Sequence, residues 1–156
     1  MPRTTKRAGR GRIRMRRPGA RRGAMAAQTR RTIDPGWGWD DRLPLAQAKQ
    51  VGDTIYVSGQ IAYDAGGKLV GEGDMKAQTR QAFENIRAIL DSAGSGLKDI
   101  VKINTYITDR SKFMDMIAAR SEVFGNDPPA STAVVVQALA FPELLVEIEA
   151  IAVKRA

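Results

Sequence analysis

The chemistry open to this chain is limited first by two absent residue types, because its 156 residues contain neither cysteine nor histidine. A thiolate nucleophile, a zinc site built from cysteine and histidine, and a Ser-His-Asp triad are therefore excluded. Proton transfer has to be carried out by Asp, Glu, Lys, Tyr or a bound water molecule. The candidates for chemistry are thus acidic and hydroxyl side chains within the apolar, ordered parts of the sequence.

Three short stretches contain such side chains: Ser58-Gly59-Gln60, Pro129-Ala130-Ser131-Thr132, and the run from Val146 to Val153. In the last of these, Glu147 and Glu149 alternate with apolar residues, which is typical of a strand with one exposed face. By alternation alone, Glu147 would simply point to solvent, as Glu149 does. Ser58 and Gly59 offer a hydroxyl group and close backbone approach to a ligand, or only a bulge at the end of a strand.

The elements that position these residues can be predicted from hydrophobic periodicity. In the N-terminal part, strands are expected at residues 45–50 and 54–59, joined by a tight turn at Gly52-Asp53. A short third strand is expected at 68–70. The preceding segment, residues 32–42, contains both tryptophans and is interpreted as a turn-rich lead-in, with Trp37 and Trp39 either capping a cleft or anchoring the segment to the core.

A first helix is the clearest local feature, because Asp74 is a good N-cap, apolar residues recur at helical spacing, and Gly94 supplies a stop signal. The elements predicted after it are a strand over 101–107 with Val101, Ile103, Thr105 and Ile107 facing the core, a second helix over 111–124, and strands over 133–136 and 146–153. The predicted order is β-β-β-α-β-α-β-β.

This order predicts an α+β fold in which one sheet carries two helices on a single face. Two helices cannot cover both faces of such a sheet, and its strands are apolar, for example Ala133-Val134-Val135-Val136. An exposed face of this kind is a liability for a monomer, so a homo-oligomer is expected.

The net charge of +8 belongs to one end of the chain. Residues 1–24 contain ten Lys or Arg and no acid, whereas the other residues carry 15 basic and 17 acidic side chains, a net charge of −2. We expect residues 1–31 to be a disordered tail and residues 32–156 to form a single domain. The tail could be a nucleic-acid arm or a targeting segment. The favoured interpretation is that the natural start is Met25 and the upstream stretch is a mis-called extension.

Membrane insertion is not expected, because no run of about 18 apolar residues occurs. The chain shows no secretion signal, so the cytoplasm is the expected location.

The order and spacing of several short motifs resemble the Rid family, the reactive-intermediate imine deaminases, also known as YjgF-like or L-PSP endoribonuclease proteins. The resemblance covers roughly residues 43–154. It is carried by Ser58-Gly59-Gln60, by Gln78 to Gly94 with Asn85 and Ile89-Leu90, by Asp99-Ile100-Val101-Lys102, by Pro129-Ala130, and by Glu147 to Ala152.

The resemblance implies a chorismate-mutase-like fold assembled as a homotrimer, with active sites in clefts between subunits. It also implies hydrolysis of enamines and imines such as 2-aminoacrylate to 2-keto acids and ammonia, without a metal or organic cofactor. Glu147 matches the family glutamate that positions and activates water, and a partly buried carboxylate with a raised pKa could do so near neutral pH. Ser58 and Gly59 match residues that line the family pocket.

This chain departs from the family at several pocket positions. The family arginine that grips the substrate carboxylate is Ser131 here, a loss on the order of 2–5 kcal/mol. The family tyrosine near the first strand appears as Leu45, and the asparagine on the second helix appears as Ile117. Arg120, one helical turn beyond Ile117, either points into the cleft, extends to solvent or pairs with an acid.

Three functional hypotheses remain. The first is hydrolytic deamination of a reactive enamine or imine other than 2-aminoacrylate, with Glu147 orienting water, Ser58 and Ser131 binding substrate, and Leu45 and Ile117 forming apolar walls. The second is a non-catalytic small-molecule-binding or regulatory module on the same fold. The third, an endoribonuclease, is opposed by the absence of histidine and by the acidic body, so nucleic-acid binding is expected only through the basic tail.

Overall fold

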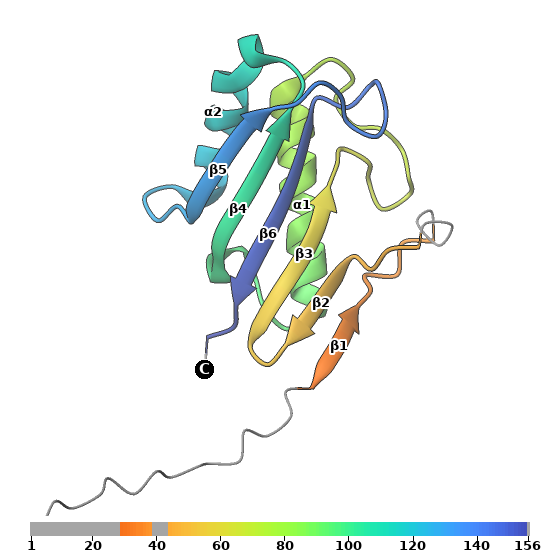
Figure 1. Cartoon of the computed structure of the whole chain (residues 1–156), viewed down its shortest axis with the longest axis vertical. Helices are drawn as coiled ribbons and strands as arrows, with labels where there is room; N and C mark the ends of the chain where they lie inside the picture. Colours follow the sequence, from red (N-terminus) through yellow and green to blue (C-terminus); the bar gives the residue numbers. More distant parts are fainter. Residues whose placement is uncertain (1–28, 39–43, 156) are drawn as a thin grey trace, which may run out of the picture.

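Six strands form one mixed sheet in the computed structural model, which describes residues 29–38 and 44–155 (Figure 1). The strands are β1 (Arg30–Ile33), β2 (Ala48–Val51), β3 (Thr54–Gln60), β4 (Ile100–Ile107), β5 (Ala130–Val135) and β6 (Val146–Val153). Their spatial order is β1-β2-β3-β6-β4-β5, and all neighbours are antiparallel except β4 and β5. The predictions for residues 1–28 and for Trp39 lie outside the described residues.

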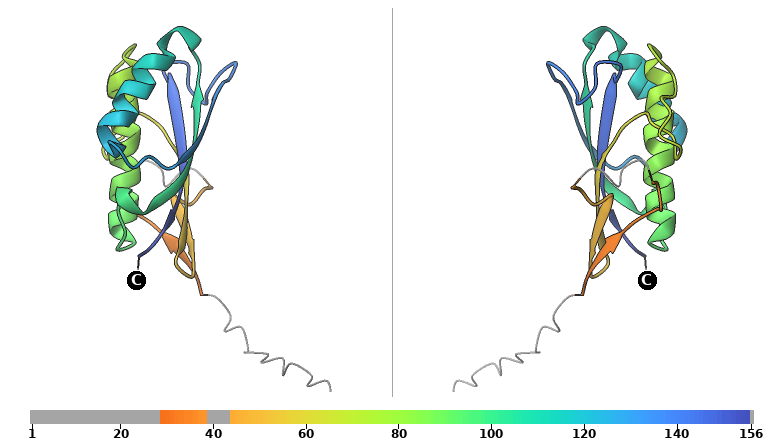
Figure 2. Two further views of the ribbon diagram at one scale, coloured as in Figure 1. Left: turned by 90° about the vertical axis from the view of Figure 1, so that its left-hand side faces the viewer. Right: turned by 90° about the vertical axis from the view of Figure 1, so that its right-hand side faces the viewer.

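Two helices pack on one face of this sheet, as predicted (Figure 2). The longer, α1 (Met75–Ser92), begins at Asp74, whose carboxylate accepts a hydrogen bond from the Ala77 N–H at 3.1 Å. It ends before Gly94, which has a φ of 68°, a conformation that glycine adopts without strain. The shorter helix, α2 (Phe113–Phe124), lies on the crossover from β4 to β5.

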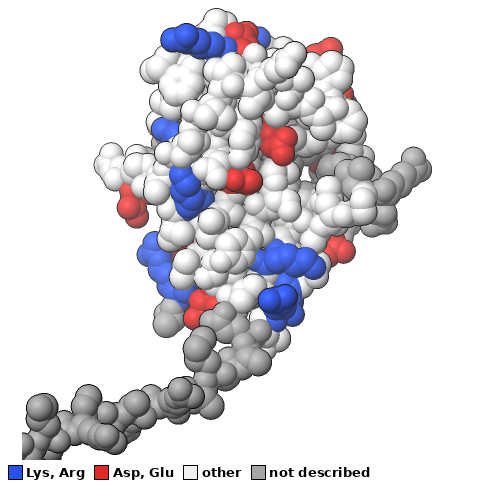
Figure 3. All heavy atoms as spheres, viewed as in Figure 1, with Lys and Arg blue, Asp and Glu red and all other residues white. Residues whose placement is uncertain are grey.

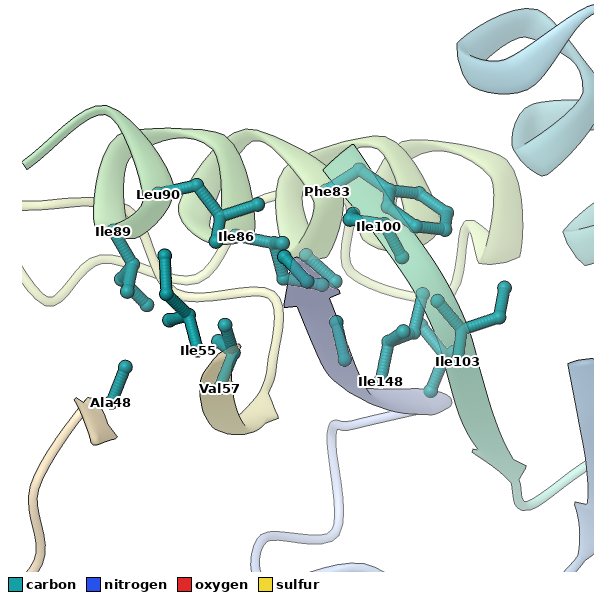
Figure 4. Packing of buried hydrophobic residues seen from close by; sticks show 14 of the residues in the cluster. Ala48, Ile55, Val57, Phe83, Ile86, Ile89, Leu90, Ile100, Ile103 and Ile148 are labelled. Atoms are coloured by element: carbon teal, nitrogen blue, oxygen red, sulfur yellow. The ribbon is translucent and has the colours of Figure 1, made fainter. Parts of the chain in front are cut away.

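The core lies between α1 and the sheet (Figure 4). Helical spacing puts Phe83, Ile86, Ile89 and Leu90 on the inner face of α1, where each is at most 1% exposed. The sheet contributes alternate residues of its strands, because successive side chains of a strand point to opposite faces. The labelled strand residues in Figure 4 are Ala48, Ile55, Val57, Ile100, Ile103 and Ile148. This packing fixes which residues of β3 and β6 point away from the helices.

No helix among the described residues covers the other face of the sheet. Along β6, Val146, Ile148 and Ala150 are buried beneath the helices, whereas Glu147 and Glu149 lie on the open side. Figure 3 views this open side and shows a mostly uncharged surface with a few separated acidic and basic groups. Tyr56, Val134 and Val153 are among its large exposed side chains. The predicted uncovered face is therefore present.

Three local predictions were wrong. The strand expected at 68–70 is reduced to one isolated bridge between Tyr63 and Leu69. The third strand before α1 is instead β1, within what was expected to be tail and lead-in; its four residues include a single buried side chain, Ile33. Val101 is 48% exposed because a bulge between Ile100 and Lys102 adds a residue opposite β6 and turns its side chain outward.

Candidate active site

Glu147 lies on β6 at the edge of a small hollow of about 140 Å³. The hollow is lined by the segment before β2, the end of β3 and the residue after it, α1, the β5–β6 connection and β6. The lining residues are Leu45, Gln47, Gly59, Gln60, Ile61, Asn85, Ala140, Phe141 and Glu147. On its other side Glu147 borders a second, wider hollow of about 400 Å³ on the open sheet face, together with Tyr106 and Glu149. The carboxylate therefore stands between two spaces that small molecules can enter.

A β-bulge in β3 creates room for this carboxylate. Val57 pairs with Ala150 and Gln60 pairs with Ile148, so Ser58 and Gly59 together lie opposite Glu149 alone. Gly59 faces Glu147 so closely that an added Cβ would lie 2.7 Å from Glu147 Cδ and would overlap the carboxylate oxygen. Any residue with a side chain at position 59 would thus displace the carboxylate.

Buried amide side chains form the floor of the hollow. Gln60 Nε2 donates to Gln47 Oε1 at 2.8 Å, and both side chains are buried. Asn85, on α1, donates to the carbonyls of Ile61 and Tyr63 at 2.9 and 2.8 Å. These bonds tie the end of β3 to the helix, because buried polar groups need such partners to offset their desolvation.

The electrostatic environment of Glu147 favours its neutral form. Burial raises the pKa of the Glu147 carboxyl, and the nearby negative charge of Glu149 raises it further. Among the residues that the structure describes, none donates a hydrogen bond to the Glu147 carboxylate, whereas Glu149 accepts one from Asn104 Nδ2 at 2.5 Å. Glu147 is thus a half-buried carboxyl group whose oxygens are free to contact water or a ligand.

The Ser58 hydroxyl has a structural partner. It donates to the carbonyl of Ala46 at 2.7 Å, and the Ser58 N–H donates to the Gln47 carbonyl at 3.0 Å. The hydroxyl proton is therefore engaged in joining β3 to the segment before β2, so a ligand could only donate a hydrogen bond to the lone pairs of the oxygen.

The other predicted site residues lie together in a different place. Arg120, on α2, donates a hydrogen bond from Nη1 to the Ser131 hydroxyl oxygen on β5 at 2.8 Å. Ile117 lies one turn earlier on α2 and packs against the core. The bond to α2 places Ser131 on the helix side of the edge strand β5, whereas Glu147 lies on the open side of central β6. Within one chain the predicted residues therefore form two groups. The first group lies around the Glu147 hollow and consists of Leu45, Ser58, Gly59 and Glu147; the second lies on the helix side of the sheet and consists of Ile117, Arg120 and Ser131.

Arg120 forms no ion pair with any acidic side chain in the described part of the chain. Its guanidinium instead bonds to the neutral Ser131 hydroxyl at an exposed sheet edge, so the expected alternative of pairing with an acid is not adopted among the described residues. The Arg120 guanidinium and the Ser131 hydroxyl are thus adjacent.

Several residues of the hollow were missed from the sequence. Gln47, Asn85 and Phe141 carry no catalytic side chain and stand in different elements. Besides the family resemblance, the available signal was the polarity of Asn85 on the mostly apolar buried face of α1, since a buried amide needs a specific partner. Phe141, a lone aromatic residue in a connection, gave no periodic signal.

The sequence of this chain is similar to those of known proteins. A family model described as Endoribonuclease L-PSP matches residues 40–154. The chain belongs to the endoribonuclease L-PSP family. A RutC family protein of Pyrococcus abyssi is 44% identical over 111 residues, 71% of this chain and 87% of that protein. A 2-iminobutanoate/2-iminopropanoate deaminase of Dermatophagoides farinae is 34% identical over 110 residues, 70% of this chain and 85% of that protein.

The fold is shared with solved members of the family. The crystal structure of YyfA from Yersinia pestis, a protein of the conserved Rid family, matches with a TM-score of 0.73 and 33% identity over 80% of this chain and 99% of YyfA. The predicted family and the α+β fold with two helices on one sheet face are therefore confirmed.

The described residues contain neither a group of metal-ligating side chains nor a membrane-spanning helix. Across residues 29–38 and 44–155, no three acidic side chains are grouped so that they could hold a metal ion. No helix in the same residues is long and apolar enough to cross a membrane.

Proposed function

We propose that this protein hydrolyses reactive enamines or imines to a carbonyl compound and ammonia. The observation that carries the proposal is the Glu147 carboxyl group, which borders the hollow, is half-buried and has a raised pKa. No described residue donates a hydrogen bond to its oxygens. A carboxylate in this state can accept a proton from a water molecule and return it to a leaving group. The family relative named as an imine deaminase supports the same chemistry.

In the proposed reaction, water adds to the electrophilic imine carbon while Glu147 accepts one of its protons. The C=N electron pair moves to nitrogen, which takes a proton and becomes an amine on a tetrahedral carbon. The amine then takes a second proton, the C–N bond breaks and ammonia leaves with the bonding pair, while the hydroxyl group loses its proton to give the C=O bond. An enamine enters the same route after protonation at carbon. No redox partner is required, because water is the only co-reactant.

The first group of site residues holds the reacting atoms in this proposal. Gly59 leaves space for the carboxylate and for close approach of the substrate to the backbone, and Leu45 supplies an apolar wall. The Ser58 hydroxyl oxygen can accept a hydrogen bond from the substrate. The natural substrate differs from 2-aminoacrylate, because the surfaces that line this hollow favour a larger and more apolar molecule.

The second group completes the site from another copy of the chain. We infer a homotrimer in which Ile117, Arg120 and Ser131 of one subunit face Glu147 of the next, because these groups lie on different sides of the sheet within one chain and the open face needs cover. Ser131 cannot neutralise a carboxylate, but Arg120, which it holds, can. A residue of α2 would thus supply the cation that other family members carry on the strand.

We infer that the reaction takes place in the cytoplasm.

A non-catalytic ligand-binding module is the second candidate, since Ser131 stands where the family has its substrate arginine. Endoribonuclease activity is the weaker alternative, because the chain has no histidine for acid–base work on a phosphodiester.

The deciding experiment is ammonia release from imines generated in situ by an amino-acid oxidase, measured with the full chain and with Glu147→Gln. We expect the wild type to accelerate release and Glu147→Gln to abolish the acceleration while keeping the same oligomeric state. Glu72→Gln, at an exposed position that lines neither hollow, is the matched control and should retain activity. Equal activity of Glu147→Gln and wild type would refute the mechanism, and no acceleration by a folded wild type would favour the binding module.

A further inference from the structure

The connection between β5 and β6 forms one wall of the Glu147 hollow and carries its largest apolar side chain. Phe141 lies in this connection and lines the hollow together with Ala140 and Leu45. Phe141 is 42% exposed and Leu45 is 52% exposed. Two large apolar side chains are thus presented beside a carboxylate in the single chain, which is unfavourable unless a ligand or another subunit covers them.

Phe141 is held by an aromatic neighbour. The ring of Tyr63 packs edge-on against the ring of Phe141, with centroids 5.7 Å apart and an interplanar angle of 65°. The Tyr63 hydroxyl donates to the Glu143 carboxylate at 2.5 Å, two residues further along the same connection. Edge-to-face aromatic pairs add stability beyond area burial, so Tyr63 fixes both the ring and the backbone that follows it.

A buried glutamine anchors the same connection to α1. Gln78 is fully buried; its Nε2 donates to the Glu143 carbonyl at 2.9 Å, and its Oε1 accepts from the Leu145 N–H at 2.8 Å. Leu144, between these two anchor points, is 1% exposed. The segment that presents Phe141 is therefore fastened on its C-terminal side, and the ring has a defined place beside the hollow.

Polarity is distributed asymmetrically around the hollow. The amide groups of Gln47, Gln60 and Asn85 are engaged with each other or with the backbone, so they present few free donors to a ligand. Glu147 supplies the charged group on one side, and Phe141, Leu45 and Ile61 supply apolar surface. A ligand that fits both has a reactive polar centre attached to a bulky apolar group.

We propose that Phe141, with Leu45, selects ligands whose reactive carbon carries a large aliphatic or aromatic side chain, and that Tyr63 and Gln78 are positioning residues for Phe141. For catalysis, the substrate class is the imine of a large apolar amino acid. That part rests on the proposed function, whereas the selection of a bulky ligand depends only on the wall described above.

The test compares two imines, derived from phenylalanine and from alanine, in ammonia release by the full chain. Phe141→Ala is expected to lower kcat/KM for the phenylalanine-derived imine about 10- to 200-fold, the effect of losing apolar pocket contacts, and to leave the alanine-derived imine within about twofold. Tyr63→Phe keeps the ring but removes the bond to Glu143, so it should raise KM for the large imine without changing kcat. Tyr56→Phe, an exposed tyrosine on the open sheet face, is the matched control.

Direct binding separates this inference from the proposed reaction. Calorimetry with phenylpyruvate and pyruvate, the corresponding keto acids, should show tighter binding of phenylpyruvate by wild type and loss of that preference in Phe141→Ala. If no imine is hydrolysed but this preference is present, the proposed reaction fails and the ligand class stands. If imines are hydrolysed and both the kinetic and binding preferences are unchanged in Phe141→Ala, the inference is overturned and the reaction stands.

Discussion

Gly59 and Glu147 share one small volume: the bulge in β3 turns the backbone of Gly59 against the Glu147 carboxylate, where no Cβ would fit. The glycine is required here for space, since its φ does not lie in the left-handed region that favours glycine. The position of the candidate catalytic carboxylate is therefore set by a missing side chain on the neighbouring strand.

We expect Gly59→Ala to abolish or strongly reduce imine hydrolysis without unfolding the protein. The added methyl group must push the Glu147 carboxylate out of place, and misplacement by about 1 Å can cost on the order of 100-fold in rate. Gly96→Ala is the matched control, because a Cβ at Gly96 meets no atom within 4 Å. Activity of Gly59→Ala equal to that of Gly96→Ala would contradict the space-filling argument.

Removing the Glu147 charge should stabilise the protein at neutral pH. A carboxyl group whose pKa is raised on folding contributes stability that is complete below its unfolded pKa and is lost as pH rises through the folded value. Glu147→Gln should therefore melt at a higher temperature than wild type at pH 7, and the two should converge near pH 4. Thermal unfolding at several pH values measures this, with exposed Glu72→Gln as control. A difference independent of pH would show that desolvation of the charge is not the cause.

Arg120 should matter only for substrates that carry a carboxylate. Loss of one charge-assisted contact corresponds to about 1.5–3 kcal/mol, so Arg120→Ala should raise KM for an imino acid by roughly 10- to 150-fold. An uncharged imine produced by an amine oxidase should be unaffected, and Arg120→Lys should recover part of the loss. Arg80→Ala, which removes an exposed arginine paired with Glu122, is the control. Equal KM changes for charged and uncharged imines would exclude a carboxylate contact.

Tyr63 should titrate at unusually high pH. The hydrogen bond to the Glu143 carboxylate, with burial and the Glu143 charge, raises the pKa of Tyr63 to about 12. The stabilising contribution of this phenol is complete below pH 10 and is lost as pH rises through about 12. An ultraviolet titration of wild type and Tyr63→Phe isolates its signal, and Glu143→Gln should move that signal toward 10. A Tyr63 signal that stays in place in Glu143→Gln would contradict the assigned bond.

The core should be far more sensitive to truncation than the wall of the hollow. Phe83 is 1% exposed and packs edge-on against Phe124, with ring centroids 5.3 Å apart. Phe83→Ala should therefore lower the free energy of unfolding by about 3–5 kcal/mol. Met114→Ala, at a position that is 68% exposed, should change it by no more than about 0.5 kcal/mol. Denaturant unfolding gives both values, and similar losses for the two variants would refute the assigned core.

The sequence predicted features that depend on neighbouring residues. Asp74 and Gly94 mark the ends of α1 because capping acts within one turn, and β6 begins and ends at Val146 and Val153 as alternation indicated. The segment at 68–70 shows the limit of such patterns, because a strand needs a partner along its length and Leu69 pairs only with Tyr63.

Features that depend on distant contacts could not be predicted in this way. The burial of Glu147 results from the bulge on β3, which alternation along β6 cannot reveal. The contact between Arg120 and Ser131 depends on the crossover that brings α2 over β5. The position of Phe141 depends on its contact with Tyr63, which precedes α1 in the sequence whereas Phe141 follows it. The family resemblance identified Glu147, and the three-dimensional contacts give the reason for its environment.

The place of β6 in the sheet also has a consequence for biosynthesis. β6 follows every other strand in chain order, yet it joins β3 to β4 in the middle of the sheet. A growing polypeptide on the ribosome thus holds two separate pieces of sheet until β6 emerges, and the long-range pairings that unite them form slowly. A chain interrupted before β6 would lack Glu147 and leave the edges of β3 and β4 exposed to aggregation. Completion of the sheet and acquisition of the candidate catalytic group are therefore one event.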